Sequence, residues 1–536
     1  MAAIFWNTGV SGFWNTASDW SSNTVPGSND DVTINAAGTY TVTISTFVGA
    51  NSLNFDAPNA TIHVNGSDFL QVGTATITGG TIDGSGSAVG EPGIIQDIPS
   101  GVWTIAASAT PLILGGGLTW QVYYSTDVVN DAGTINIGDA AGLNATIENS
   151  GSFNLTTDSA GIGLNSVNVS GSLNSGIGNF ANFGTLAKTG GTDTSHISAS
   201  YTSSGGGSKI SVSTGTLEFD GPSNTFSVGT IIEPGIIAFG AGSSNFNINP
   251  TIANFLIDGG SVSFSNTLSY GGNFSETGGS LTFSGSPTFR GTFSLSGGSV
   301  TLSSGQTLTL PAATSFSGGS ITGGTVALNG TTNVNGSAVI QAAVANNGTI
   351  DVNAGLLDLG GAVSGNGTIT INNGTGVEFG QASATSQKVN FASGSKATLK
   401  LDQPSAFQSA ITDFQTTDTI DLAGVTANGA FYSSGNLTLY NGATPVLQLS
   451  LSTPYSRNRF GVGPDGVGGT VVTVSQPPLP PSPSDFNHDG NSDLLWQNDD
   501  GTVAVWELNG ASLIGGGGPG NPGTSWQVKG SGRSGR

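Results

Sequence analysis

The pattern Gly259-Gly260-Ser261-Val262-Ser263-Phe264 is the clearest indication of how this chain folds. It returns as Gly278-Gly279-Ser280-Leu281-Thr282-Phe283, as Gly297-Gly298-Ser299-Val300-Thr301-Leu302 and as Gly318-Gly319-Ser320-Ile321-Thr322, at sequence steps of 19, 19 and 21. A related unit that begins at Asn347 returns at Asn366, again one repeat further along the chain. A repeat of this length is typical of a chain that folds by stacking many similar units.

Each unit places a glycine-containing turn before a run in which small polar residues alternate with β-branched, aliphatic or aromatic ones. Alternation with period two indicates a strand with one buried face, and glycine favours the turn that precedes it. A single turn of the repeat cannot bury its apolar side alone, whereas stacked turns bury it against one another. We therefore predict an all-β fold, a right-handed parallel β-helix (β-solenoid) with β caps at both ends. A string of separate β-sandwiches is the alternative.

Shifts in composition divide the chain into five predicted regions. Residues 1–65 hold three of the eight Trp and are expected to form an N-terminal β cap, and residues 66–385 to form the solenoid. The Gly-Gly-Ser pattern stops in residues 386–475, which we expect to form a C-terminal β capping region. Prolines and serines make 476–484 a stiff linker, and residues 485–536 form a small final module.

Charge and composition exclude several kinds of partner and site. The 536 residues include 33 acidic and 11 basic side chains, a formal net charge of −22, and no Lys or Arg precedes Lys188. Because nucleic acids and anionic membrane surfaces are bound through Lys and Arg, we expect neither as a partner. The absence of Cys excludes disulfides and thiolate-bound metals. No apolar run is long enough to form a membrane-spanning helix, so we expect no membrane insertion.

The first residues lack the basic start and the apolar run of a secretory signal. This leaves two alternatives, a protein that stays inside the cell and one that is exported by another route. The abundance of Gly, Ser, Thr and Asn, with very few Lys, favours the second. We therefore expect an extracellular or cell-surface protein that is exported without a cleaved N-terminal signal.

Two groups of residues flank the repeat region. They are Trp14, Asp19-Trp20, Val25-Pro26-Gly27 and Asp30-Asp31-Val32 near the start, and Leu399-Lys400-Leu401-Asp402, Asp418-Thr419-Ile420-Asp421-Leu422 and Asp465-Gly466-Val467-Gly468-Gly469-Thr470 after it. Together they resemble large secreted bacterial β-strand-repeat proteins, of the kind described as autotransporter-like or haemagglutinin-like passengers. The resemblance implies an elongated extracellular protein and little about activity.

The final module opens with Asp485-Phe486-Asn487-His488-Asp489-Gly490-Asn491-Ser492-Asp493. Oxygen-bearing side chains at alternate positions converge on one hard cation, and the glycine allows the sharp turn between them. The predicted calcium ligands are Asp485, Asn487, Asp489, Asn491 (through its backbone carbonyl) and Asp493. With Leu494-Leu495-Trp496 after it, the loop resembles that of FG-GAP or VCBS-type repeats, which implies a structural Ca²⁺. In that family several repeats build a propeller, so one repeat is an incomplete propeller; a simple polar turn is the alternative.

Three aromatic residues near the start, Trp6, Trp14 and Trp20, have two interpretations. Exposed rings can stack on sugars, and buried rings can cover the open end of a solenoid. We favour the cap.

The sequence gives little support for catalysis. The repeat region holds three basic residues and a single histidine, His196. Its acidic residues, Asp220, Asp258 and Glu276 among them, are scattered, and only Asp258 and Glu276 lie close to one repeat apart. General acid–base chemistry needs paired carboxylates, so we predict no catalytic residues and no enzyme.

We therefore expect a non-enzymatic extracellular β-solenoid that serves as a surface adhesin or a matrix protein, with calcium ordering its C-terminal module. Its partners would be glycans, other cell-surface molecules or further copies of the chain. Two other functions stay open. One is a carbohydrate-active enzyme on the same scaffold, a polysaccharide lyase or hydrolase, and the other is a self-assembling fibre or sheath.

Overall fold

The chain forms an all-β parallel β-solenoid of about 17 turns, with small antiparallel sheets near its ends, as the repeat predicts. The computed structural model describes residues 3–520 apart from 8, 86–90, 109, 139–143, 170–171, 176, 233, 454, 456–459, 475–485, 487–492, 498–499 and 510–511. Two compact units are present: unit 1 comprises residues 1–313 and 319–324, and unit 2 comprises 314–318 and 325–536. No helix among the described residues is long and apolar enough to cross a membrane.

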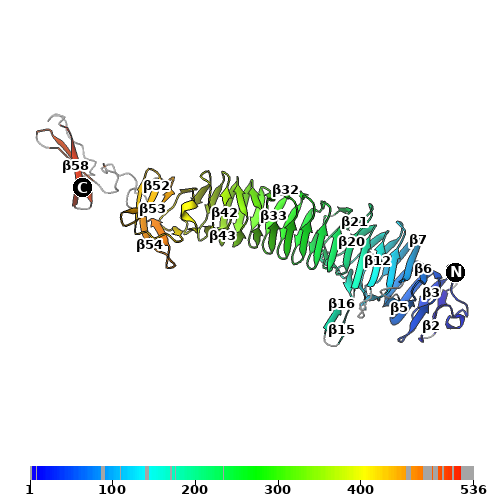
Figure 1. Cartoon of the computed structure of the whole chain (residues 1–536). Coiled ribbons are helices and arrows are strands. Elements are labelled where there is room, and N and C mark those ends of the chain that lie inside the picture. The colour runs from blue at the N-terminus through cyan, green and yellow to red at the C-terminus, as the bar shows by residue number, and fades with distance from the viewer. Residues whose placement is uncertain are drawn as a thin grey trace, which may run out of the picture. The chain divides into compact units, whose positions relative to one another are not determined.

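In unit 1 the strands of successive turns lie side by side and pair in parallel as three long ladders (Figure 1). The long strands β5 (Val48–Val64), β6 (Phe69–Gly84) and β7 (Gly93–Ile105) each contribute to more than one ladder. Ladder 1 also contains β1 (Ala3–Phe5), β3 (Asp31–Ile34), β10 (Val128–Asp131), β13 (Ser152–Leu155), β18 (Thr185–Lys188), β21 (Lys209–Val212) and β24 (Thr230–Ile232). Ladder 2 contains β2 (Gly12–Phe13), β4 (Thr41–Ile44), β8 (Leu112–Leu114), β11 (Thr134–Ile137), β14 (Gly161–Leu164), β19 (Thr194–Ile197), β22 (Thr216–Phe219), β25 (Ile236–Phe239), β27 (Asn254–Ile257), β30 (Asn273–Glu276) and β33 (Thr292–Leu295). Ladder 3 contains β9 (Leu118–Val122), β12 (Asn144–Asn149), β17 (Ile177–Asn182), β20 (Ser200–Ser203), β23 (Ser223–Phe226), β26 (Ser243–Phe246), β28 (Ser261–Phe264), β31 (Ser280–Phe283), β34 (Ser299–Leu302) and β37 (Ser320–Thr322).

Smaller elements complete unit 1. They are a short parallel sheet of β29 (Ser269–Tyr270), β32 (Thr288–Phe289) and β35 (Thr307–Leu310), the antiparallel pair β15 (Ser166–Val169) and β16 (Ser172–Ser175), and the 3₁₀ helix η1 (Ala17–Asp19). Strands within residues 1–65 already belong to the ladders, so the parallel pairing begins close to the start of the chain.

The sequence repeat is also the register of the sheet. Val262 lies opposite Leu281 and Phe264 opposite Phe283, so equivalent positions of successive units are direct neighbours. In the turn before β31, Gly279 has a φ of +79°, a left-handed conformation that glycine adopts without strain. The glycine pairs therefore fix where each strand begins.

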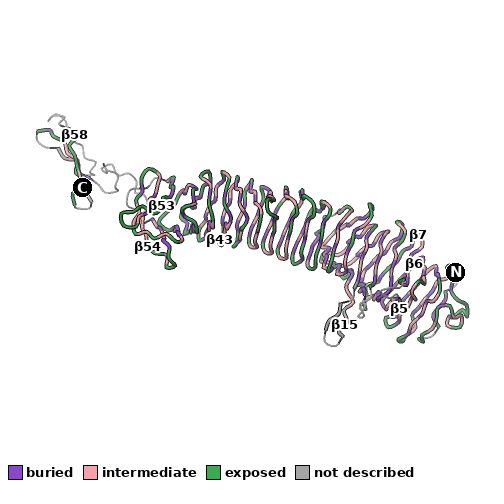
Figure 2. The backbone as a smooth tube through the Cα atoms, viewed as in Figure 1, coloured by how far each residue is buried: buried purple, intermediate pink, exposed green. Residues whose placement is uncertain are grey.

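Along the strands, buried residues alternate with partly exposed ones, and many residues of the turns are exposed (Figure 2). Inside ladder 3 the rings of Phe226, Phe246, Phe264 and Phe283 stack, with centroid separations of 4.4, 5.0 and 5.6 Å in that order. The apolar core is thus a set of columns that run from turn to turn.

Unit 2 continues the same type of pairing and ends in antiparallel sheets. Its parallel strands are β36 (Ala313–Phe316), β38 (Thr325–Leu328), β39 (Thr331–Asn335), β40 (Ala338–Ile340), β41 (Ala343–Asn346), β42 (Thr349–Ala354), β43 (Leu356–Leu359), β44 (Val363–Ser364), β45 (Thr368–Ile371), β46 (Gly376–Phe379), β47 (Lys388–Phe391), β48 (Thr398–Leu401), β49 (Ala410–Thr412) and β50 (Thr419–Leu422), with the 3₁₀ helix η2 (Pro404–Ala406) before β49. The antiparallel strands are β51 (Gly429–Ser433), β52 (Asn436–Asn441), β53 (Thr444–Ser450), β54 (Phe460–Pro464), β55 (Thr470–Val474), β56 (Leu494–Gln497), β57 (Val503–Asn509) and β58 (Ser512–Gly520).

Candidate functional site

The three N-terminal tryptophans lie together and are buried. Trp6 and Trp14 each contact Trp20 edge-to-face, with ring centroids 4.9 Å apart in both pairs. The indole nitrogen of Trp20 donates a hydrogen bond of 2.6 Å to the carbonyl of Trp14. At most 3% of any of these residues is exposed, and a ring that stacks on a sugar must present one open face. The packing therefore suits the cap interpretation.

Of the proposed calcium loop, the structure describes Phe486 and Asp493. Asp485, Asn487, Asp489 and Asn491 lie outside the described residues. Asp493 is buried, and its two carboxylate oxygens accept hydrogen bonds from the backbone N–H groups of Phe486 and Leu508, at 2.7 and 3.0 Å. These bonds hold the Asp493 carboxylate against the backbone of Phe486 and of β57.

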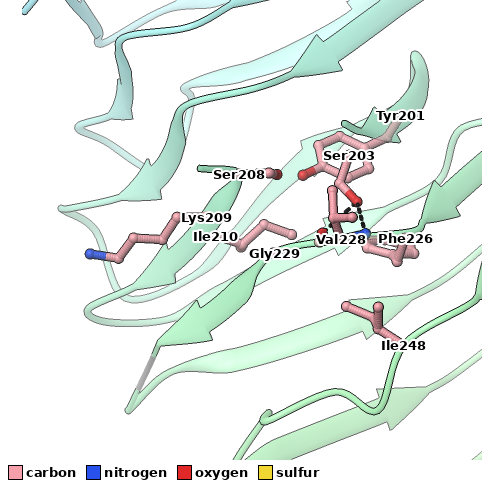
Figure 3. Close-up of a pocket in the computed structure, with 9 residues that line it drawn as sticks. All are labelled: Tyr201, Ser203, Ser208, Lys209, Ile210, Phe226, Val228, Gly229 and Ile248. Atoms are coloured by element: carbon pink, nitrogen blue, oxygen red, sulfur yellow. Dashed lines mark hydrogen bonds between the residues drawn. The ribbon is translucent and has the colours of Figure 1, made fainter. Parts of the chain in front are cut away.

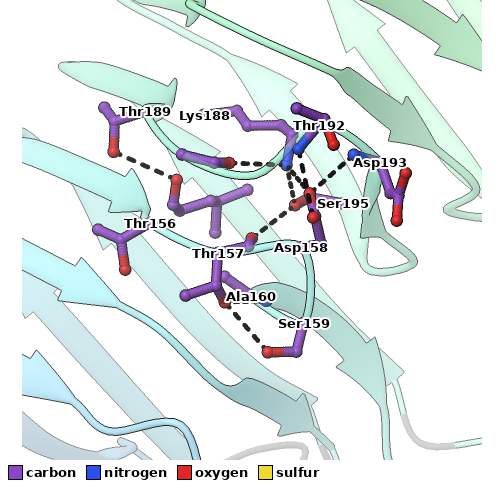
Figure 4. Close-up of polar contacts among 12 residues, drawn as sticks. Thr156, Thr157, Asp158, Ser159, Ala160, Lys188, Thr189, Thr192, Asp193 and Ser195 are labelled. Atoms are coloured by element: carbon purple, nitrogen blue, oxygen red, sulfur yellow. Dashed lines mark hydrogen bonds and ion pairs between the residues drawn. The ribbon is translucent and has the colours of Figure 1, made fainter.

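A buried lysine forms a polar network inside unit 1 (Figure 4). The Nζ atom of Lys188, on β18, donates to Asp158 Oδ1 (3.1 Å), the carbonyl of Gly190 (3.0 Å) and Ser195 Oγ (3.0 Å). The lysine side chain is fully buried, and Ser195 Oγ in turn donates to the carbonyl of Thr157. Because all three ammonium donors have acceptors, the network explains how the buried charge of Lys188 is tolerated.

A hollow of about 500 Å³ lies against β57 and β58, and two other cavities in the described part of the chain are too small for a sugar chain. One, between ladders 1 and 3 and lined by Tyr201, Ser203 and Phe226 among others, has a volume of about 10 Å³ (Figure 3). That is room for one water molecule. The other, in unit 2 beside Asp413 and Tyr455, has a volume of about 230 Å³. Sites for small organic ligands usually measure about 300–1,000 Å³.

A group of three titratable side chains that could bind a cation lies on the outer face of ladder 2. His196 on β19 is in register with Glu218 on β22, one turn further on, and Asp220 follows β22 directly. His196 Nδ1 lies 2.6 Å from Asp220 Oδ2 and 3.8 Å from Glu218 Oε2. One ligand atom from each of the three side chains lies within 4.8 Å of the other two. We call these three residues the HED cluster.

Burial and repulsion act on the carboxylates of the HED cluster. Partial burial raises the pKa of Glu218 to about 7, and the negative charges of Asp220 and Asp258 add to this rise. The histidine side chain is 54% exposed, whereas those of Glu218 and Asp220 are 15% and 20% exposed. The cluster can therefore share protons or hold a cation, and solvent reaches it from the histidine side.

The HED cluster is not among the sites predicted from the sequence, because that prediction treats the acidic residues as scattered and does not consider Glu218. The structure corrects this, since Glu218 and Asp220 both face His196. Both follow His196 at longer intervals than those that separate the clearest repeats. Aligning Thr194-Ser195-His196-Ile197 with Thr216-Leu217-Glu218-Phe219 is the signal that could have found the pair.

No protein-family model, curated protein or solved structure matches the chain. The chain is a β-solenoid repeat protein.

Proposed function

We propose that this protein is a non-enzymatic β-solenoid that acts outside the cell as a surface adhesin or matrix protein. We further propose that it binds glycans through the outer face of ladder 3. The resemblance of its flanking segments to autotransporter-like or haemagglutinin-like passengers supports an extracellular role.

The observation that carries the proposal is an uncharged polar face on seven consecutive strands of unit 1. The outward residues, at least partly exposed, are Ser200 and Thr202, Ser223 and Thr225, Ser243 and Asn245, Ser261 and Ser263, Ser280 and Thr282, Ser299 and Thr301, and Ser320 and Thr322. We call this surface the hydroxyl face. Strands in a sheet are spaced by about 4.8 Å, so the face repeats donors and acceptors at a regular interval.

The hydroxyl face is ordered by its own hydrogen bonds. Ser280 Oγ donates to Ser261 Oγ at 3.0 Å, which links neighbouring strands in one column. Such short side chains lose little conformational entropy when a partner binds. A neutral and regular surface that runs over seven strands suits an extended polysaccharide better than a compact ligand that needs a pocket.

The test is retention of the full chain on a panel of plant and bacterial polysaccharides. Both retention and the release of new reducing or unsaturated ends are scored, with and without Ca²⁺. The double variant T282V/T301V removes two hydroxyls from adjacent strands and keeps the branched side chains that strands favour. We expect it to weaken retention about thirtyfold, because each of the two lost hydrogen bonds contributes about 1 kcal/mol.

T292V is the matched control. Thr292 is exposed on β33 in ladder 2, outside the hydroxyl face, and its loss should leave retention unchanged. The proposal is supported if the wild type is retained without releasing new ends and T282V/T301V is retained more weakly. No retention on any glycan, or equal retention by all three proteins, contradicts it.

A second candidate, a carbohydrate-active enzyme, is favoured only by the two carboxylates of the HED cluster. Their ligand oxygens lie within 4.8 Å, closer than the roughly 5–5.5 Å of retaining glycosidases or the roughly 6.5–9.5 Å of inverting ones. If the wild type releases new ends and E218Q does not, the proposed function becomes that of a carbohydrate-active enzyme.

We also propose that the loop from Asp485 to Asp493 binds one structural Ca²⁺, as its resemblance to FG-GAP or VCBS-type repeats implies. Bound calcium would offset the repulsion among its carboxylates. We predict that Ca²⁺ slows proteolysis of the segment 485–536 in the full chain, and that D489N abolishes this protection. Identical cleavage rates with Ca²⁺ and with EDTA would contradict the site.

A further inference from the structure

We propose that the HED cluster, His196, Glu218 and Asp220, is a binding site for one divalent transition-metal ion, with Zn²⁺ the ion that its donor atoms favour. The site goes beyond the adhesin function and does not depend on it. It would lie on the outer face of ladder 2 and tie two neighbouring turns together, since His196 comes from β19 and the carboxylates from β22 and the residues after it.

The distances in the HED cluster are close to those of a metal site. Zinc binds nitrogen and oxygen at about 2.0–2.2 Å, so two ligand atoms of a tetrahedral ion are separated by about 3.3 Å. The observed separations from His196 Nδ1 are 2.6 Å to Asp220 and 3.8 Å to Glu218, and no separation exceeds 4.8 Å. Small side-chain rotations therefore bring all three atoms to one ion. Water would occupy the remaining position on the exposed side.

The imidazole distinguishes this cluster from a group of acidic residues. Exposed carboxylates alone favour hydrated Ca²⁺ or Mg²⁺ weakly, whereas a nitrogen ligand favours zinc and its neighbours in the transition series. The Nδ1 atom of His196 already faces both carboxylates, so a metal would replace the proton that it shares with Asp220.

The next turn leaves room for the two carboxylates. Gly240 follows β25, and a Cβ atom placed on it would meet Glu218 Oε1 and lie 2.6 Å from Asp220 Oδ1. Its nearest neighbours are all side-chain atoms of these two residues, and Gly240 is not among the glycines with positive φ. Neither the backbone conformation nor close backbone packing therefore requires a glycine at position 240. It makes space for the carboxylates of the HED cluster.

A second cluster of acidic side chains in the solenoid has a basic residue that neutralises it, which the HED cluster can be compared with. In unit 2, Lys400 Nζ contacts Glu378 and lies 3.2 Å from Asp402, so a lysine supplies the positive charge. In the described part of the chain, the ion pairs of Glu218 and Asp220 are with His196. Asp258 follows β27, two turns beyond Glu218, and adds a further negative charge that acts on Glu218. The HED cluster thus has an excess of negative charge that a dication would balance.

The test measures zinc binding to the full chain at neutral pH, by calorimetry and by metal analysis after dialysis. Excess Ca²⁺ is present throughout, to fill the predicted loop at 485–493. We expect one bound Zn²⁺ in the wild type. E218Q and D220N should each weaken its binding at least tenfold, and far-UV circular dichroism without metal should show that both variants keep the fold.

The chain offers a matched control in a second His–Asp pair. His63 Nδ1 lies 2.6 Å from Asp83 Oδ1, on neighbouring strands of the same ladder, and no third carboxylate or imidazole joins them among the described residues. D83N should therefore leave zinc binding unchanged. H488A, which removes the histidine of the predicted calcium loop, should also have no effect.

G240A gives an independent result because it changes no ligand. The added methyl group should displace both carboxylates and weaken zinc binding, while thermal unfolding without metal stays close to that of the wild type. X-ray absorption should show the outer-shell scattering of one imidazole ring around the bound zinc. Wild-type affinity in E218Q and D220N, loss of binding in D83N or H488A, or a zinc shell with two imidazoles would each overturn the proposal.

Discussion

The buried carboxyl side chains of unit 1 include those of Asp97, Asp131 and Glu276. Burial raises the pKa of each to about 8, and for Asp97 the charge of Asp127 adds to the effect. The backbone N–H of Ser299 donates a hydrogen bond of 2.9 Å to Glu276 Oε1, and Glu276 Oε2 has no hydrogen-bond partner among the described residues. At neutral pH these groups are mostly protonated, which lets the solenoid bury them without burying charge.

These groups make the stability of unit 1 depend on pH. A raised pKa means that the folded protein holds a proton that the unfolded chain has already released at neutral pH. The contribution to stability is therefore complete below the ordinary carboxyl pKa of about 4 and is lost as the pH rises toward 8. We predict that the thermal midpoint of the wild type falls between pH 5 and pH 9.

E276Q should remove part of this pH dependence, because glutamine resembles the protonated acid and cannot ionise. At pH 9 we expect E276Q to be more stable than the wild type by about 1–3 kcal/mol, and at pH 5 nearly equal to it. Denaturant midpoints across this pH range measure the difference. E148Q, at an outward position of β12, is the control and should follow the wild-type curve. If the stabilities of E276Q and of the wild type changed equally with pH, the raised pKa assigned to Glu276 would be wrong.

Each strand separates the apolar interior of the solenoid from its polar exterior. In β28 the inward residue Phe264 stacks between Phe246 and Phe283, and the adjacent residue, Ser263, points outward. Because each turn of a solenoid contacts mainly its neighbours, the free energy of unfolding depends on such columns turn by turn.

F264A should therefore leave a cavity in the column and destabilise unit 1 by about 3–5 kcal/mol. S263A, one residue away on the same strand, should change stability by less than about 1 kcal/mol. Denaturant unfolding measures the totals, and hydrogen exchange should show that the loss of protection with F264A is greatest in β26, β28 and β31. Equal effects of the two substitutions would mean that the stacked rings do not carry the core.

A stack of parallel strands has to end without exposing a long unpaired edge. In unit 1 the first strands of ladders 1 and 2, β1 and β2, are only three and two residues long, and the buried tryptophan cluster lies beside them. In unit 2, β55 pairs antiparallel with β50, the last strand of its parallel ladder. Short strands and a change of direction are both ways in which natural sheets protect their edges.

W20A should expose the start of the ladders. The Trp20 ring contacts both Trp6 and Trp14, and its indole nitrogen donates a hydrogen bond to the Trp14 carbonyl, so the substitution removes the central member of the tryptophan cluster. We predict that W20A self-associates at micromolar concentration, measured by light scattering, whereas the light scattering of the wild type stays unchanged at the same concentration. F47A removes an exposed ring of unit 1, 66% accessible, and should not associate. An unchanged scattering profile for W20A would argue against a capping role.

Much of the fold follows from local features of the sequence. The Gly-Gly pairs set where strands begin and the two-residue alternation sets which side chains are buried, because turn conformation and side-chain direction are properties of the strand itself. Stacking follows, since a single turn cannot bury Val262 and Phe264 without the turns on either side.

Contacts between turns depend on register, which local patterns do not specify. Glu218 follows His196 at a longer interval than the one that separates the clearest repeats, so a fixed period does not align them. The same holds for Lys188, whose partner Asp158 lies far earlier in the chain. A solenoid with an apolar interior and a polar exterior can thus be predicted from the residues alone, because those features are local. Which charged groups meet is settled by the folded chain, because loops of variable length set the pairing between turns.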